Sequence, residues 1–345
     1  MQIQDDPEVL FHVTLTGGQT KYKDRGKLAL HWLPQETALA CEKLRSDINT
    51  LQTSIAKLFT TPKGMEPKLY FDFLDSSDAN ALAFTDGSWS FIGLTGGFPE
   101  QTMTKVEKLI GCPSFPKWLA IETEHYQSKP RAVSESLFRL VLSFVWAHEL
   151  GHHISGHVPL EAAKHVRFEA MDCSKEGSLR RQAEELDADK HGIETLLHQL
   201  KRDPGAFFDS NMSGLSATSP NREMQLRFLL AAVAVFLLST EQCRYSAATI
   251  GTLTHPPRLI RIDFITGVMR DWLKKESVDS TLTKNDFYTL VDRIETPNPE
   301  GADVFNAEYQ AKALSDEEWK RYFADLSEVR TSVRKENEQR EWKRV

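Results

Sequence analysis

The short stretch from His148 to His152 carries the residues of this chain best suited to chemistry. It follows the pattern His-Glu-x-x-His at the end of a strongly apolar run, residues 137–147. Histidines four residues apart lie one above the other on one face of a helix, so two imidazole nitrogens can bind one zinc ion. Glu149 can then act as the general base that takes a proton from the attacking water, as in metal-dependent hydrolases.

The apolar run indicates how this motif is positioned. A helix that is apolar nearly all round is buried, and we expect such a helix from about Ser134 to His153. Burying two histidines and a glutamate there is costly unless something binds them. The surroundings of the motif therefore favour a metal site.

A catalytic zinc needs a third protein ligand and one open position. The extended pattern His-Glu-x-x-His-x-x-Gly-x-x-His is absent, because Ser155 and Val158 occupy the positions of its glycine and its third histidine. The other possible source is a glutamate on a following helix, which we predict over residues 178–200. On that helix Glu185 is the candidate ligand, and its neighbour Glu184 is the alternative.

Glu185 begins the pattern Glu-x-x-Ala-Asp. Asp189 shares its helix face and can hydrogen-bond a ligand histidine from outside the coordination sphere, while the small Ala188 lets two helices approach closely.

His153 and His157 are also four residues apart and could form a second metal site. No carboxylate in matching register accompanies them, so we expect polar residues at the rim of the cleft.

Together, the His-Glu-x-x-His and Glu-x-x-Ala-Asp motifs resemble those of the gluzincin peptidases of the CAAX prenyl protease and HtpX type. Two further segments are similar to that family and occur in the same order. They are Asn80-Ala81-Leu82-Ala83, followed after a turn by Ile92-Gly93-Leu94, and Thr254-His255-Pro256-Pro257 with Arg261-Ile262. The four matches span about residues 78–262.

The resemblance implies a zincin-like core and further site residues. It places His255 at the cleft as a donor to the oxyanion, with Arg261 in support, although His255 could instead be a proline-flanked turn residue. It also implies that substrate binds near Asn80 and along the strand expected at 89–95, through Ile92, Gly93 and Leu94. An extended substrate could pair with that strand as an added β-strand.

Composition limits the function classes. The 345 residues include 40% hydrophobic and 26% charged residues, as in soluble globular proteins, and the net charge of −7 disfavours nonspecific nucleic-acid binding. The longest uncharged run, residues 228–240, is shorter than the roughly 20 residues that cross a bilayer, so we expect no integral membrane insertion. Four scattered cysteines and an N-terminus without a secretory pattern favour the cytoplasm. Composition does not indicate an oligomeric state.

The predicted fold class is α+β, mainly helical, with a small sheet whose edge strand borders the active site. We expect an N-terminal α/β segment over 1–75, a zincin-like metallopeptidase core over 76–295, and a charged helical tail over 296–345. We also predict strands at 8–15 and 68–74, and a strand, turn and strand over 76–98. Further helices are predicted over 34–59, 222–245, 286–294 and 315–344, and one more begins at 257. The segment at 112–131 is expected to be irregular.

These patterns predict a zinc endopeptidase with one zinc ion per chain, held by His148, His152 and Glu185. Bacterial defence and quality-control proteases, including a phage-exclusion class, share this general layout, so we expect a restricted cellular protein as substrate. Two alternatives remain open. One is a regulatory protein that retains a metallopeptidase core, and the other is a metal-dependent hydrolase of a non-peptide amide.

Overall fold

The computed structural model of the chain describes residues 6–16, 30–119 except 32, 121–158 except 122, 167–168, 179–203, 222–239, 246–277 except 247 and 254, and 314–345. Within these ranges the protein is mainly helical, with one four-stranded and one two-stranded sheet. This content confirms the predicted α+β class. The predicted helix over 286–294 lies outside the described residues.

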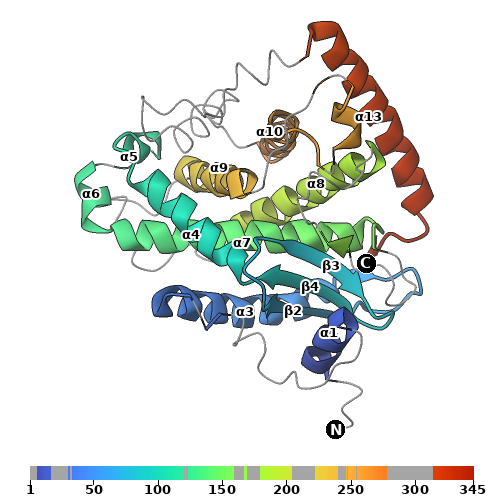
Figure 1. Ribbon diagram of the computed structural model, residues 1–345, viewed down its shortest axis with the longest axis horizontal. Coiled ribbons are helices and arrows are strands. Elements are labelled where there is room, and N and C mark those ends of the chain that lie inside the picture. The colour runs from blue at the N-terminus through green and yellow to red at the C-terminus, as the bar shows by residue number, and fades with distance from the viewer. Residues whose placement is uncertain are drawn as a thin grey trace.

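The helix α7 (Pro130–Ile154) is the centre of the fold and carries the His-Glu-x-x-His motif. Its whole second half is buried, because the apolar run at 137–147 leaves no polar face for solvent. Figure 1 shows the four-stranded sheet on one side of α7 and the helices α8, α9 and α10 on the other. The predicted helix is therefore confirmed, with a start four residues earlier than expected.

Three predicted helices form the layer beside α7: α8 (Leu179–Arg202), α9 (Arg222–Ser239) and α10 (Arg258–Lys275). α10 begins directly after Pro257, as the proline predicts. In α9 nearly every residue is buried, because the helix packs against both α4 and α7. Among the described helices, none combines the length and the apolar character needed to cross a bilayer.

The helices α7 and α8 approach each other closely, and glycines permit this contact. A Cβ on Gly151 of α7 would lie 2.9 Å from His191 Cβ and 3.0 Å from Ala188 Cα of α8. On the other helix, a Cβ on Gly192 would lie 3.3 Å from His148 Cα. Both contacts involve backbone that cannot move aside. The helices therefore approach closely beside the motif, as the small Ala188 predicts.

The four-stranded sheet comprises β2 (Leu69–Leu74), β3 (Ala81–Thr85), β4 (Ser90–Thr95) and β5 (Arg167–Phe168), in the order β2-β4-β3-β5. β4 pairs with β3 in an antiparallel hairpin and with β2 in parallel. The prediction that residues 89–95 form an edge strand is therefore wrong. The hairpin gives β4 its neighbour β3, which is close in the sequence. Its other neighbour, β2, comes from a separate segment, and the local sequence pattern does not reveal this pairing.

The N-terminal element also differs from its prediction. Residues 8–15 do not form a strand, because α1 is a helix (Pro7–Thr16). Its Phe11 is buried against Phe84 and Phe91 of the sheet. The helix signal lies just upstream, where the Asp6 carboxylate accepts a hydrogen bond from the Glu8 backbone N–H 3.0 Å away and Pro7 occupies the first helical position.

The elements between α3 and α6 agree with the predictions in part. α3 (Gln35–Ala56), β2 and the β3–β4 hairpin confirm the expected elements. The helix α4 (Gly97–Ile110) forms where the sequence patterns predict none, and α5 (Phe115–Trp118) and α6 (Thr123–Ser128) occupy the segment expected to be irregular. Because β2 belongs to the same sheet as β3 and β4, the expected boundary at residues 75 and 76 lies within one sheet.

The C-terminal helix α13 (Asp316–Asn337) packs on α8. Ser315 and Glu318 form a capping box at its start. Beyond the helix, β6 (Lys343–Arg344) pairs with β1 (Phe59–Thr60), so the helix predicted over 315–344 ends at Asn337. The charged tail therefore lies against the helix layer rather than apart from it.

The close contact of the two central helices leads to a prediction with an internal control. Gly151→Ala should lower stability by about 1–3 kcal/mol, because the new methyl group meets backbone atoms of α8. Gly267→Ala in α10 should instead be neutral or stabilise by up to ~1 kcal/mol, because no described atom lies within 4 Å of its Cβ. Chemical denaturation and metal content of both variants test this. Equal stability of the two variants would contradict the close approach.

Candidate metal centre and catalytic residues

Three fully buried side chains meet between α7 and α8: His148, His152 and Glu185. His148 Nε2 lies 3.3 Å from Glu185 Oε2, and His152 Nε2 lies 3.7 Å from Glu185 Oε1. One nitrogen or oxygen atom from each residue lies within 4.8 Å of the others. This group could hold a metal ion, and two imidazole nitrogens with one carboxylate form a donor set that suits zinc.

The register of α8 selects Glu185 over its neighbour. Glu184 points elsewhere on the helix surface, where its carboxylate lies 3.4 Å from the Arg180 guanidinium one turn earlier. Consecutive helical residues differ by about 100° around the axis, so only one of the two glutamates can face α7. The structure brings Glu185 to the histidines, in line with the motif.

Asp189 lies one turn beyond Glu185 and is fully buried beside His148. The His148 Nδ1 atom is 3.0 Å from Asp189 Oδ1. Arg261 of α10 binds the same carboxylate with two hydrogen bonds, Nε to Oδ2 at 2.7 Å and Nη2 to Oδ1 at 2.6 Å. Burial by itself would raise the pKa of Asp189, but the charge and hydrogen bonds of Arg261, with those of His148, lower it to about 2. Asp189 is therefore an ionised acceptor for His148 Nδ1–H.

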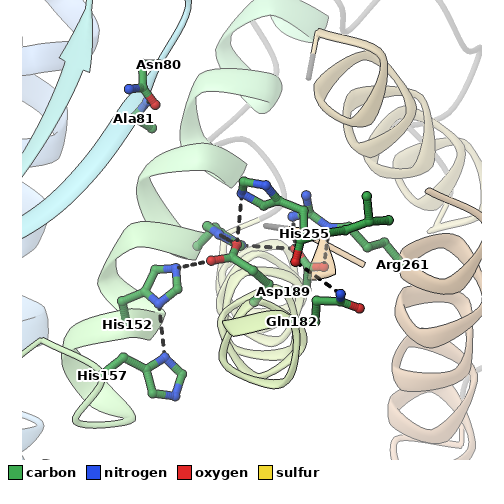
Figure 2. A network of polar contacts seen from close by, with 11 residues as sticks. Asn80, Ala81, His152, His157, Gln182, Asp189, His255 and Arg261 are labelled. Atoms are coloured by element: carbon green, nitrogen blue, oxygen red, sulfur yellow. Dashed lines mark hydrogen bonds and ion pairs between the residues drawn. The ribbon is translucent and has the colours of Figure 1, made fainter. Parts of the chain in front are cut away.

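The family resemblance implies that Arg261 supports His255. In the structure its side chain is buried, packs over the Phe236 ring and binds Asp189. The reason is its position on α10, on the helix face that packs against α8. Arg261 can therefore orient His148 through Asp189 (Figure 2).

His157 is a site residue that the sequence patterns miss. Its Nδ1 lies 3.0 Å from the His152 Nδ1, and both rings are buried, which corrects the expected rim position (Figure 2). Five residues separate the two histidines, and that spacing does not bring side chains together on a helix. The contact exists because α7 ends and Gly156, with φ +69°, turns the chain back. The only local signal is this glycine just after the helix.

His153 takes no part in the cluster. Its Nε2 lies 3.0 Å from the Phe91 carbonyl oxygen of β4, and its ring stacks on Trp342. Burial lowers the pKa of His153 to about 4, so the imidazole is neutral and donates Nε2–H to that carbonyl. His153 therefore ties the end of α7 to the sheet, and the expectation of a rim residue is wrong for it as well.

Of the predicted catalytic side chains, His255 lies at the cluster, and Glu149 is a buried neighbour of His148 in the sequence. Glu149 follows His148 on α7 and is fully buried. His255 reaches the cluster from the segment before α10, with its Nε2 3.6 Å from Glu185 Oε2 and its side chain 14% exposed. Figure 2 shows the His255 ring directed toward the ligand group. The proline-flanked segment therefore carries its histidine into the site.

The predicted substrate residues divide into two groups. Asn80 lies at the start of β3, on the side of the sheet that faces the cluster (Figure 2). Ile92, Gly93 and Leu94 lie in the interior strand β4, with both neighbouring strands paired to them. Their backbone is engaged on both sides, so they cannot pair with a substrate strand, and that expectation is wrong.

One comparison with known proteins gives a match to a family of peptidases. Residues 105–271 match the family model described as Peptidase U49, which supports a peptidase. The matched range covers a little under half of the chain and includes α7, Glu185 and His255, but neither Asn80 nor α13. No curated protein and no solved structure matches the chain.

The register of α8 predicts which glutamate binds metal. Glu185→Ala should lower metal affinity at least tenfold, because one of three ligand side chains is removed. Glu184→Ala should keep the metal, because that carboxylate faces Arg180. Metal analysis after dialysis against a weak chelator measures both. Loss of metal in the Glu184 variant, or in both variants equally, would overturn the assignment.

Proposed function

We propose that the protein is a zinc endopeptidase of the gluzincin arrangement. The observation that carries this proposal is the buried cluster of His148, His152 and Glu185, with Glu149 next to the first histidine on the same helix. The match of residues 105–271 to Peptidase U49 supports peptide hydrolysis as the reaction class. We further propose one zinc ion per chain and a protein substrate.

The ligand set supports zinc as the metal. The Nδ1 atoms of both histidines face partners in the protein, Asp189 and His157, so both Nε2 atoms can present a lone pair to the ion. With three protein ligands, one coordination position stays open for reaction. A zinc ion held there would act as a Lewis acid, polarising the scissile carbonyl and lowering the pKa of a water molecule.

Glu149 is proposed as the general base. Its carboxylate accepts a proton from the water that attacks the scissile carbonyl carbon. The same carboxyl group then donates that proton to the nitrogen of the leaving amine as the carbon–nitrogen bond breaks. Its place on α7, fully buried and directly after the proposed ligand His148, supports this role.

His255 is proposed to stabilise the oxyanion that forms on the carbonyl oxygen. Its position supports this role, since its Nε2 lies 3.6 Å from a ligand carboxylate while part of the ring stays accessible. Pro256 and Pro257 follow it and restrict the backbone at the start of α10, so the ring has a reproducible direction. A preorganised donor of this kind contributes most when charge develops in the transition state.

The substrate backbone is proposed to lie along the outer edge of β3, the strand that begins beside Asn80 at the site (Figure 2). Among the described strands, β5 pairs with this edge at Leu82 and Ala83 only. The end of β3 near Asn80 and Ala81 is therefore the place where an extended peptide can add as a strand. This replaces β4 as the strand that aligns the substrate.

We expect Glu149→Gln to keep zinc and stability but to lower kcat by ~10²-fold or more, because the amide cannot accept the proton. Zinc content, thermal melting and cleavage of an unfolded protein such as casein are measured on one preparation. Glu184→Gln is the matched control, since it makes the same change outside the cluster. Turnover near wild type in the Glu149 variant would exclude the mechanism.

For His255→Ala we expect kcat to fall by ~10²-fold with nearly unchanged zinc content and melting temperature. A turn residue would behave in the opposite way, with lower stability and normal turnover of the folded fraction. His198→Ala, which removes a histidine that contacts Trp272 away from the cluster, controls for a general loss of an imidazole. If His255→Ala retains its turnover, His255 has no part in the reaction.

A further inference from the structure

One fully buried amide connects α8, the segment before His255 and the C-terminal helix. Gln182 lies one turn before Glu185 on α8. Its Nε2 donates to the Ile250 carbonyl at 2.7 Å and to the Leu253 carbonyl at 3.1 Å. Its Oε1 accepts a hydrogen bond from the Tyr322 hydroxyl of α13. Three segments that lie far apart along the chain therefore meet at Gln182, whose side chain lies near His255 in Figure 2.

The two carbonyls belong to the segment that delivers His255. Ile250 begins the 3₁₀ turn η3 (Ile250–Thr252), and Leu253 follows it two residues before His255. Bonding both ends of this turn to one amide fixes its position relative to α8. Glu185 is three residues beyond Gln182 on the same rigid helix. The hydrogen bonds of Gln182 therefore connect the segment that carries His255 to the helix that carries Glu185.

The Tyr322 hydroxyl determines which way the amide points. An amide can rotate so that its oxygen and nitrogen exchange places, and only one orientation offers N–H groups to the two carbonyls. The hydroxyl donates to the oxygen and so stabilises that orientation. Tyr322 is itself buried, in an apolar cluster with Ala183 and Leu186 of α8 and with Ile250.

Ion pairs hold α13 in place at the next turns of α8. Asp187 is 3% exposed and accepts hydrogen bonds from Arg330 Nε at 2.7 Å and from Arg334 Nη2 at 2.6 Å. Both arginines belong to α13. A buried carboxylate bound by two guanidinium groups resists displacement of the helix, because separation would leave its charge unpaired.

We propose that Gln182 is a positioning residue that holds His255 in its place beside Glu185, and that Tyr322 acts through Gln182, so that α13 is part of the catalytic unit. The proposal rests on the role assigned to His255 under the proposed function. A misplacement of about 1 Å at a reacting group can cost ~10²-fold in rate, so a second layer of fixed hydrogen bonds has a direct effect on turnover.

Tyr322→Phe tests the proposal with the smallest change, the loss of one hydroxyl group. We expect kcat to fall about tenfold with unchanged KM and zinc content, because the amide loses the bond that orients it. Tyr126→Phe is the matched control. Tyr126 is also a buried tyrosine, and its hydroxyl donates to the Ile110 carbonyl at 2.9 Å, away from the cluster. Unchanged kcat in Tyr322→Phe, or an equal loss in both variants, would overturn the proposal.

The His255→Ala background separates positioning from a general structural role. If Tyr322 acts through Gln182 on His255, then adding Tyr322→Phe to His255→Ala should leave kcat unchanged, because the group being positioned is already absent. Gln182→Leu should behave in the same way. A further loss of kcat equal to that in the wild-type background would contradict the proposal.

A second readout does not depend on the proposed function. The imidazole NMR signals of His255, assigned by their absence in His255→Ala, report its surroundings whether or not the protein cleaves peptides. Tyr322→Phe should shift or broaden these signals, and Tyr126→Phe should not. If the wild-type protein cleaves nothing and the signals still respond, the proposed function fails while the positioning stands. Signals unaffected by Tyr322→Phe would overturn the positioning itself.

Discussion

The close approach of α7 and α8 is the constraint on which the rest of the structure depends. Gly151 and Gly192 remove the side chains that would separate the two backbones. At that distance the Glu185 carboxylate lies between two histidines of the neighbouring helix, all three fully buried. The cost of burying such groups is offset only when they bind one another or an ion, so the contact that builds the core also builds a group of side chains that could hold a metal ion.

The ligand histidines are held by two different kinds of partner. His148 faces an ionised carboxylate that Arg261 keeps charged, whereas His152 faces a second histidine, His157. The first arrangement places negative charge beside the cluster. Together with Glu185, this gives the candidate metal centre two nearby carboxylates, and Arg261 binds the carboxylate of Asp189.

The site is assembled from segments across most of the chain rather than from the motif helix alone. α10 contributes Arg261, the segment before α10 contributes His255, and we propose β3 as the side on which substrate binds. The C-terminal helix reaches the same place through Tyr322 and Gln182. A region that looks like a charged tail in the sequence is thus packed against α8, because its narrow apolar stripe and its arginines both find partners on that helix.

What the sequence determined by itself is local. The spacing of His148 and His152, and of Glu185 and Asp189, places each pair on one helix face, because helical geometry repeats within a few residues. Only the tertiary structure decided which elements meet. It made β4 an interior strand through its pairing with β2, and it brought Arg261 to Asp189, His157 to His152 and Tyr322 to Gln182. Most of these contacts join residues that are far apart in the sequence, and the contact of His157 depends on a single turn. The stabilisation that they give comes from tertiary packing, which the periodicity of a local segment does not encode.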